Sequence, residues 1–323
     1  EINIKFSPIS ESEYNSWVSL QGKNRYIITI LSRQITARQI GEVTRVVAEQ
    51  GLNIDAIQRL TGRIPLDESA RKPKSCIELS VRGTPKDKSS MQSNFMQLSS
   101  ELGMDISFQQ DDMFRRCRRL ICFDMDSTLI ETEVIDELAI RAGVGDEVKA
   151  ITESAMRGEI DFSESFERRV ALLKGLDVSV MEDIAQNLPI TEGVDRMMQV
   201  LKTAGFKIAI LSGGFTYFGN ANELEIENGK LTGKHIGDIV DGKRKAELLR
   251  LIAQVENVDI AQTIAVGDGA NDLPMLNIAG LGIAYHAKPK VKENASQSIS
   301  TIGLDGVLYF LGFKDSYIGD NKI

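Results

Sequence analysis

Residues 118–131 of the chain read RRLICFDMDSTLIE. The apolar run of this stretch, Leu120 to Phe123, is too short for a helix and is typical of a strand buried on both faces. Two aspartates, Asp124 and Asp126, follow the run directly. Open α/β sheets bind ligands beyond the carboxyl ends of their strands, so we expect both carboxylates at a binding cleft.

The spacing of Asp124 and Asp126 predicts a metal site. Two carboxylates this close repel each other unless a cation or a shared proton relieves them. A hard cation with oxygen ligands fits such a pair, and Mg²⁺ is the one we expect. An isolated D-x-D pair is more often an acidic turn that caps a helix, so the choice depends on the rest of the chain.

The composition excludes several classes of protein. The 323 residues carry a net charge of -8, which argues against a general binder of nucleic acid or of anionic membranes. Three cysteines are too few for a disulfide framework, and two histidines without Cys/His spacing argue against structural zinc. We find no apolar run long enough to span a bilayer and no signal peptide, and we expect a cytoplasmic protein.

The first twenty residues are expected to be a linker or the tail of an upstream module. Residues 2–6 alternate like a strand, and the start of a short helix follows from Ser10 to Trp17. A similar succession recurs from Met104 to Phe114. We therefore expect an upstream module, similar to the next one in the chain, to precede Glu1.

Residues 21–110 have the pattern of a small α/β domain. Strands are predicted over residues 26–31, 52–60, 75–82 and 104–108, and helices over residues 36–50 and 86–102. Thr36 is the predicted N-cap of the first helix, and Gly103 ends the second. The order βαββαβ is that of a ferredoxin-like unit, and it resembles an ACT domain. The resemblance implies an amino-acid effector at this domain, or dimerisation through its sheet.

Residues 119–323, after a linker at 111–118, predict a Rossmann-like parallel sheet with an inserted helical cap. Apolar spacings of three and four run through residues 134–190, and no strand pattern appears before Lys207 to Leu211. Further buried strands are predicted at residues 263–266 and 280–285. A helical insertion after the first strand indicates a cap over the cleft.

Two later strands also end in groups that bind ligands. Residues 207–211 run into Ser212-Gly213-Gly214, whose hydroxyl and backbone N–H groups can face an anion. Residues 263–266 run into G-D-G-A-N-D at 267–272. Three parallel strands with such ends define one cleft, which favours the functional interpretation of Asp124 and Asp126 over the capping turn.

One connection is shorter than this fold requires. Between Ser212 and Ala221 lies about half of the dozen or more residues that a parallel crossover needs. We infer that roughly a dozen residues are absent here, between Gly219 and Asn222. Beyond it, a hairpin is predicted to turn at Asn228-Gly229.

Together these motifs resemble those of the haloacid-dehalogenase-type phosphatases. They are D-M-D-S-T at 124–128, S-G-G at 212–214, a later lysine, and G-D-G-A-N-D at 267–272. Longer matches, at residues 133–139, 155–158, 161–162 and 168–170, resemble the phosphoserine phosphatases. The resemblance covers about residues 118–300. It implies a Mg²⁺-dependent hydrolysis of O-phosphoserine, the last step of serine biosynthesis.

The resemblance implies distinct roles for the aspartates. Asp124 is expected to attack phosphorus and form an aspartyl-phosphate, while Asp126 acts as general acid and then as general base. The expected metal ligands are the Asp124 carboxylate, the Asp126 main-chain carbonyl and the Asp268 carboxylate. Asp272 is expected to orient metal-bound water from the second shell of the site.

The resemblance also implies the groups that hold the phosphate. Ser212 and the Gly213 N–H are expected to bind phosphoryl oxygens, and Asn271 to hydrogen-bond the phosphate or the substrate. The motif lysine is assigned to Lys245, because it opens a helix as the family lysine does. Lys243 remains an alternative, since the sequence does not fix the register.

Charged residues of the cap are expected to recognise the amino-acid part of the substrate. Arg169 can bind the carboxylate bidentately, and Glu133 can pair with the ammonium. Met156 and Phe162 are expected to close over the substrate. Without the resemblance, Arg169 would be interpreted as a surface ion pair on a charged helix.

Two alternative functions remain at this point. One is a related small-molecule phosphatase or a phosphotransferase, for example one that passes the phosphoryl group to homoserine. The other is a non-catalytic amino-acid sensor in which only the ACT-like domain acts, although the intact motif aspartates argue against it. We expect the protein to be a homodimer.

Overall fold

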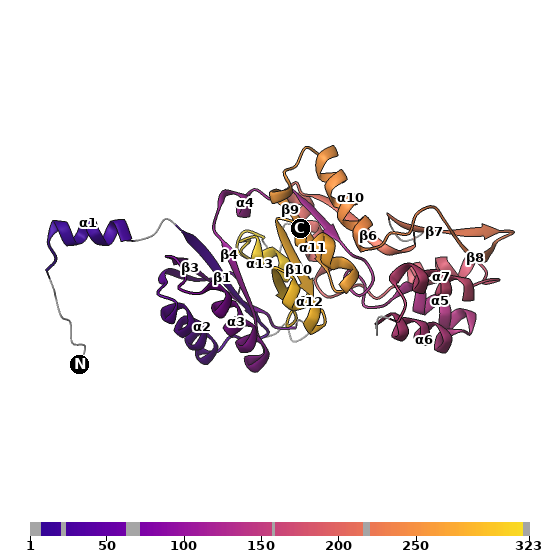
Figure 1. Cartoon of the computed structure of the whole chain (residues 1–323), viewed down its shortest axis with the longest axis horizontal. Helices are drawn as coiled ribbons and strands as arrows, with labels where there is room; N and C mark the ends of the chain where they lie inside the picture. The colour runs from indigo at the N-terminus through magenta and orange to yellow at the C-terminus, as the bar shows by residue number, and fades with distance from the viewer. Residues whose placement is uncertain (1–7, 21–23, 63–71, 157–158, 216–219, 319–323) are drawn as a thin grey trace. The chain divides into compact units, whose positions relative to one another are not determined.

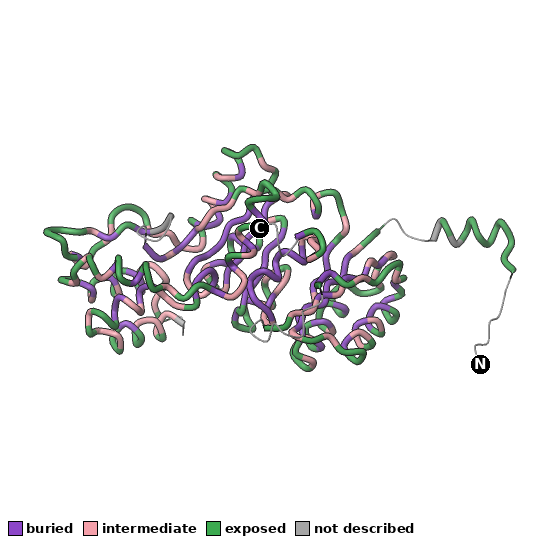
Figure 2. The backbone as a smooth tube through the Cα atoms, turned by 180° about the vertical axis from the view of Figure 1, so that it is seen from behind, coloured by how far each residue is buried: buried purple, intermediate pink, exposed green. Residues whose placement is uncertain are grey.

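The computed structural model describes residues 8–20, 24–62, 72–156, 159–215 and 220–318. The chain divides into two compact units, Glu1–Asp112 (unit 1) and Met113–Ile323 (unit 2). Figure 2 shows that buried strands run through the middle of each unit while the outer helices carry the exposed residues. No helix in the described part of the chain is long and apolar enough to cross a membrane.

Unit 1 has the predicted βαββαβ order after one additional helix. Its elements are α1 (Glu11–Leu20), β1 (Arg25–Ser32), α2 (Ala37–Glu49), β2 (Asn53–Arg59), β3 (Ser75–Arg82), α3 (Lys88–Leu102) and β4 (Asp105–Gln110). The strands form an antiparallel sheet in the order β2-β3-β1-β4. Apolar residues of β1, α2 and α3 share one core, so both helices cover the same face of the sheet (Figure 1).

The predicted helix ends of unit 1 are confirmed. Thr36 caps α2, because its hydroxyl accepts from the Gln39 N–H at 3.3 Å while the Gln39 side chain bonds back to Thr36. Gly103 ends α3 with a φ of 60°, a conformation that glycine adopts without steric cost. The helix expected from Ser10 is present as α1, whereas the strand expected at residues 2–6 lies outside the described residues.

Unit 2 is built on a seven-stranded sheet in the order β11-β10-β9-β5-β6-β7-β8. The strands are β5 (Leu120–Phe123), β6 (Lys207–Phe215), β7 (Asn220–Glu227), β8 (Lys230–Ile236), β9 (Thr263–Gly267), β10 (Leu281–Tyr285) and β11 (Gln297–Ile299). All pairs are parallel except β7 with β8. The four residues of β5 are fully buried, as predicted for a strand covered on both faces. The predicted fold class is therefore confirmed.

Helices of unit 2 fall into two groups. The first group follows β5 and comprises α5 (Val134–Ala142), α6 (Gly145–Met156), α7 (Phe162–Leu172) and α8 (Ser179–Gln186). The remaining helical elements are α4 (Met113–Arg116), α9 (Val194–Thr203), α10 (Gly242–Val255), η1 (Ile260–Gln262), η2 (Ala270–Asp272), α11 (Leu273–Ile278), α12 (Pro289–Asn294) and α13 (Gly306–Phe310).

The inserted group of helices does not form the cap alone. Its apolar core is shared with Leu224 and Leu231 of the β7–β8 hairpin. The Gly175 N–H donates to the Leu231 carbonyl at 2.8 Å, and Figure 1 shows α7 beside β8. The predicted helical insertion is present as α5 to α8, and the hairpin covers apolar residues that these helices would leave exposed.

The hairpin itself turns where the sequence predicted. Asn228 has a φ of 52° and Gly229 a φ of 76°, so both residues of the turn are left-handed. This is the geometry of the two-residue turn that Asn-Gly favours.

The short connection after β6 departs from the expected strand end. The strand was predicted to end at Leu211, but β6 continues to Phe215 and pairs directly with β7 in parallel, Leu211 opposite Asn220 and Phe215 opposite Asn222. The extension follows from β7, which offers the later residues a backbone partner. Residues 216–219 lie outside the described residues, and the inference that roughly a dozen residues are absent here stays a prediction.

Candidate active site

Three segments meet at one edge of the unit 2 sheet, namely the residues that follow β5, the residues that follow β9, and Ser212 within β6. Phe123 at the end of β5 pairs with Ile210 of β6 and with Val266 of β9. This register brings Asp124, Ser212 and Asp268 to the same level of the sheet. The three motifs that the sequence placed at strand ends therefore line one site.

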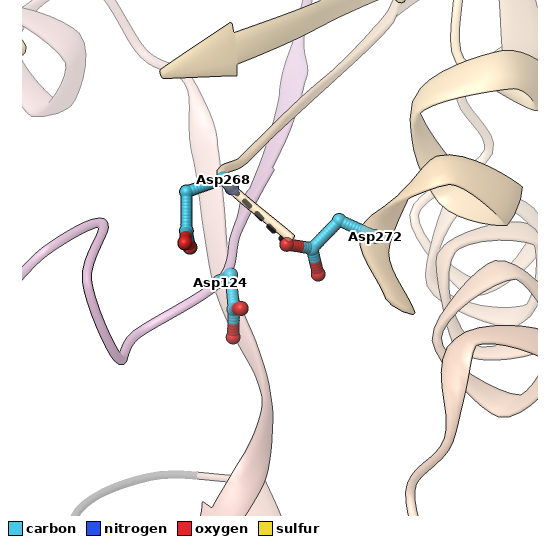
Figure 3. A group of neighbouring side chains, drawn as sticks. All are labelled: Asp124, Asp268 and Asp272. Carbon is cyan, nitrogen blue, oxygen red and sulfur yellow. Dashed lines mark hydrogen bonds between the residues drawn. The ribbon is translucent and has the colours of Figure 1, made fainter. Parts of the chain in front are cut away.

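Three carboxylates come together at this edge (Figure 3). Asp124, Asp268 and Asp272 each offer an oxygen, and these oxygens all lie within 4.8 Å of one another. Asp272 uses both of its oxygens within the protein: Oδ1 accepts from Lys245 at 2.7 Å, and Oδ2 accepts from the N–H groups of Asp268 at 3.1 Å and Gly269 at 3.0 Å. Asp124 and Asp268 are the members better placed to hold a cation directly. Oxygen donors of this kind suit a hard divalent cation.

Lys245 connects two of these carboxylates. Its side chain is fully buried, and its Nζ lies 2.8 Å from Asp124 Oδ1 and 2.7 Å from Asp272 Oδ1. Burial lowers the pKa of Lys245, but the two carboxylates outweigh burial and leave the pKa above its ordinary value. Lys243, on the same helix, is exposed. Of the two lysines that the sequence left open, the structure places Lys245 at the aspartates.

Two carboxyl groups of this cluster, those of Asp124 and Asp268, have a raised pKa. The pKa of Asp124 is raised by burial and by the charge of Asp272, although Lys245 opposes the increase. Burial and Asp272 raise the pKa of Asp268 to about 6, against the Thr128 hydroxyl that donates to it at 3.1 Å. Such crowding of acids in a low dielectric is expected where a cation or a reacting group is to be bound.

Asp126 lies between the cap and the Ser212 loop. Its Oδ1 accepts from the Val134 N–H at 2.9 Å, at the start of α5, and its Oδ2 lies 3.4 Å from the Ser212 hydroxyl. Burial raises the pKa of Asp126. A β-carbon on Gly214 would lie only 2.7 Å from Oδ2, so glycine is required for the carboxylate to occupy this position. A carboxyl group in this setting can carry a proton and deliver it at the site.

The Ser212-Gly213-Gly214 segment is held from both sides. The Gly214 N–H donates to the buried Ser212 hydroxyl oxygen at 2.8 Å. Asn222 donates its side-chain N–H to the Gly213 carbonyl at 2.8 Å and accepts from the Val240 N–H at 2.7 Å. Sequence reasoning missed Asn222, and its only signal was its place just after the short connection.

The two charged residues assigned to the cap are Glu133 and Arg169, and both interact electrostatically with Asp126. Burial and the charge of Asp126 raise the pKa of Glu133 to about 7, and the Ser127 hydroxyl donates to Glu133 Oε1 at 2.8 Å. Burial lowers the pKa of Arg169, while the charges of Glu133, Asp136 and Asp126 act against that decrease. The exposed ion pair on this helix belongs to Arg168 instead, which bonds Glu164.

Three further predicted site residues are Phe162, Met156 and Asn271. Phe162 begins α7, and a β-carbon on Gly213 would lie 3.0 Å from its ring, so Phe162 lies over the Ser212 loop. Met156 ends α6, and its side chain lies outside the described part of the structure. Asn271 lies in η2, where its carboxamide oxygen occupies the space beside Gly269.

Comparison with known proteins supports this arrangement. Residues 118–280 match the haloacid dehalogenase-like hydrolases. The chain belongs to this family. Residues 25–109 of this hydrolase match the ACT domain. Both predicted resemblances are thereby confirmed.

Relatives of this haloacid dehalogenase-like hydrolase are phosphoserine phosphatases. The enzyme of Streptomyces coelicolor is 40% identical over 304 residues, 90% of this chain and 72% of that protein. The enzyme of Archaeoglobus fulgidus is 47% identical over 243 residues, 72% of this chain and 71% of that protein. A solved substrate-bound phosphoserine phosphatase complex has a TM-score of 0.56 and 40% identity, and covers 60% of this chain and 98% of that chain. These matches confirm that the protein is a phosphatase.

Proposed function

We propose that the protein hydrolyses O-phosphoserine to serine and inorganic phosphate, the last step of serine biosynthesis. The observation that carries the proposal is that Glu133 and Arg169 interact electrostatically with Asp126, and Arg169 with Glu133. A cation and an anion beside a phosphate loop match the carboxylate and ammonium of an amino-acid phosphate ester. The phosphoserine phosphatase names of the relatives support the same substrate.

Asp124 is the nucleophile of the proposed reaction. Lys245, 2.8 Å from Oδ1, orients the carboxylate and supplies positive charge as the phosphoryl group approaches. A bond forms between Asp124 and phosphorus as the bond from phosphorus to the serine oxygen breaks. The product of this step is an aspartyl-phosphate.

Asp126 moves the protons of both steps. In the first step it donates its proton to the departing serine oxygen, and the raised pKa of its carboxyl group favours the protonated form that this requires. In the second step it accepts a proton from the water that attacks phosphorus. The bond from Asp124 to phosphorus then breaks, and phosphate leaves.

The phosphoryl oxygens are held by Ser212, the Gly213 N–H and Asn271. Mg²⁺ is the expected cofactor, with the Asp124 carboxylate, the Asp126 main-chain carbonyl and the Asp268 carboxylate as ligands. Bound at these oxygens, Mg²⁺ would shield the negative charges of nucleophile and phosphate. Asp272, held by Lys245 and by two backbone N–H groups, orients the loop and the water beside it.

The cap recognises the amino acid in this proposal. Arg169 binds the substrate carboxylate and Glu133 binds the ammonium. Phe162, which lies over Gly213, closes the cleft together with Met156. Closure of this kind excludes water from the phosphoryl group until the serine has left.

The proposal also covers the domain boundaries, the effector of the ACT-like domain and the oligomeric state. We propose that residues 21–110 form the ACT-like domain, which binds an amino-acid effector, and that residues 119–323 form the phosphatase domain, with residues 1–20 and 111–118 as tail and linker. The ACT domain match supports an amino-acid ligand. A cytoplasmic homodimer is the proposed form of the enzyme.

Product analysis tests hydrolysis against phosphoryl transfer. The protein is incubated with O-phosphoserine and Mg²⁺, with and without homoserine, and inorganic phosphate, serine and phosphohomoserine are measured. Hydrolysis predicts equal amounts of serine and phosphate in both reactions. Turnover that requires homoserine and yields its phosphate ester would contradict the proposal and identify a transferase.

A further inference from the structure

Ser127 follows the acid/base Asp126 and has an unusual backbone conformation. Its φ is 56°, in the left-handed region that residues other than glycine, asparagine and aspartate rarely adopt. In the described structure only three other residues that are not glycine have a positive φ, namely Asn228, Asn257 and His286. Such backbone conformations persist where the surroundings enforce them, and they cluster at functional sites.

Two hydrogen bonds from Ser127 account for this conformation. Its N–H donates to the Thr132 carbonyl at 3.2 Å, which closes the loop that leads to α5. Its hydroxyl donates to Glu133 Oε1 at 2.8 Å. The preceding residue, Asp126, accepts from the Val134 N–H at 2.9 Å. Asp126 and Ser127 together therefore hold the first residues of the cap.

The Glu133 carboxylate needs such a partner. It is partly buried, and its environment includes the negative charges of Asp126, Asp268 and Asp136, all of which disfavour its ionised form. The Ser127 hydroxyl acts in the opposite direction, since a donor to a carboxylate stabilises the charged form. An ionised, fixed carboxylate is what a substrate ammonium requires.

We propose that Ser127 is a specificity-determining positioning residue for the ammonium group of the substrate: its left-handed backbone directs the hydroxyl to Glu133 and fixes that carboxylate where the ammonium binds. The proposal rests on the proposed function, because it assigns Ser127 a role through Glu133 in recognition of phosphoserine. Ser127 itself does not contact the phosphoryl group in this account.

Two variants of Ser127 lack the hydroxyl but differ in how well they tolerate the left-handed backbone conformation. Ser127→Ala removes the hydroxyl and keeps a side chain in the left-handed region, whereas Ser127→Gly removes the hydroxyl and tolerates that region. Thr132→Ala is the matched control, because the Thr132 hydroxyl belongs to the same loop but donates to Glu137 at 3.1 Å. Each protein is assayed with O-phosphoserine and with 3-phosphooxypropanoate, which is phosphoserine without the ammonium group.

We expect the Ser127 variants to change KM for phosphoserine but not KM for the deaminated ester. Both Ser127 variants should raise KM for phosphoserine about tenfold, the lower end expected for a lost hydrogen bond to a charged group. Their kcat for phosphoserine and their KM for the deaminated ester should stay within about twofold of wild type, as should all values for Thr132→Ala. Equal increases in KM for both substrates, or no increase for phosphoserine, would overturn the proposal. A wild-type protein that does not prefer phosphoserine to the deaminated ester would instead overturn the substrate assignment itself.

Discussion

Lys245 Nζ lies 2.8 Å from Asp124 Oδ1, and solvent reaches none of the lysine side chain and only 7% of the aspartate side chain. The lysine comes from α10 and the aspartate follows β5, so two elements distant in sequence supply one buried ion pair. Asp272 extends the pair to a triad through its own 2.7 Å contact with Lys245. This triad is the structural centre of the proposed nucleophile.

Replacing Lys245 with methionine should damage both stability and activity. Methionine keeps much of the side-chain volume but leaves two aspartates without their buried cation. We expect the metal-free protein to lose about 3–5 kcal/mol of unfolding free energy, the usual cost of breaking a buried pair. We expect kcat to fall about 10²–10³-fold, as when a preorganised group at an active site is removed. Urea unfolding and phosphate release measure the two effects.

Lys243→Met is the control for this prediction. Lys243 is exposed on the same helix, two residues earlier, and the sequence alone left it as the alternative. The free energy of unfolding of Lys243→Met should stay within about 0.5 kcal/mol of the wild-type value, and its kcat should equal that of wild type. Equal losses in the two variants would refute the assignment of Lys245.

Asp268 should make the metal-free protein less stable as pH rises. Its pKa is about 6 in the folded chain against 3.8 as the reference value. An acid whose pKa is raised by folding contributes stability that is fully present below the unfolded pKa and is lost as pH rises through the folded pKa. We expect a loss of about 2 kcal/mol between pH 4 and pH 6.5, out of about 3 kcal/mol over the whole titration, since each pKa unit corresponds to about 1.4 kcal/mol.

The measurement compares wild type with Asp268→Asn in chelator, by urea unfolding across this pH range. Asparagine does not titrate, so the difference between the two proteins isolates the carboxyl group. Mg²⁺ should then stabilise wild type at pH 6.5 more than the variant, because a cation that binds the folded state raises its stability. A difference that is constant with pH, or that grows in favour of wild type, would contradict the prediction.

Arg169→Ala should weaken binding of phosphoserine selectively. The variant removes the cation assigned to the substrate carboxylate, so KM for phosphoserine should rise about 30-fold or more, from a loss of about 2 kcal/mol or more. KM for phosphoethanolamine, which has no carboxylate, should change by less than about threefold. The adjacent Arg168, whose partner is Glu164 on the surface, provides the control variant Arg168→Ala. An equal rise for both esters would refute the carboxylate role of Arg169.

Gly214→Ala should lower kcat by displacing the acid/base. A β-carbon at this position would lie 2.7 Å from Asp126 Oδ2, so the carboxylate has to move. Displacements of about 1 Å at a reacting group cost on the order of 10²-fold in rate. Steady-state kinetics check the loss, and Gly41→Ala serves as the control because its β-carbon meets no atom within 4 Å. Unchanged kcat in Gly214→Ala would show that Asp126 does not need its observed position.

The sequence predicted the centre of the site because its signals are local. Four apolar residues followed at once by Asp124 indicate a buried strand with a carboxylate at its end, and a shorter apolar run, Ile264 to Val266, precedes Gly267 and Asp268. Parallel strands place such ends at one edge, so the meeting of Asp124, Ser212 and Asp268 followed from the strand assignments. The family resemblance supplied the roles.

Features that depend on contacts between distant segments were beyond the sequence. The extension of β6 to Phe215 needs β7 as a backbone partner, and the contribution of the hairpin to the cap needs the apolar surface of α5 and α7. Asn222 lies on β7 and bonds Gly213 of the neighbouring strand β6, nine residues earlier in the chain. The choice of Lys245 over Lys243 needed the register of α10, which is set by its Asp241 cap. None of these contacts has a local pattern.

The covalent mechanism through Asp124 is tested most directly by phosphate release from O-phosphoserine, measured for wild type and for Asp124→Asn, each with Mg²⁺ and with chelator. Asparagine keeps the shape of the nucleophile but cannot form the aspartyl-phosphate. We expect rapid release by wild type with Mg²⁺, loss of that release in chelator, and no release above background by the folded variant. Release by Asp124→Asn at a rate near that of wild type would contradict the covalent mechanism and the role of Asp124.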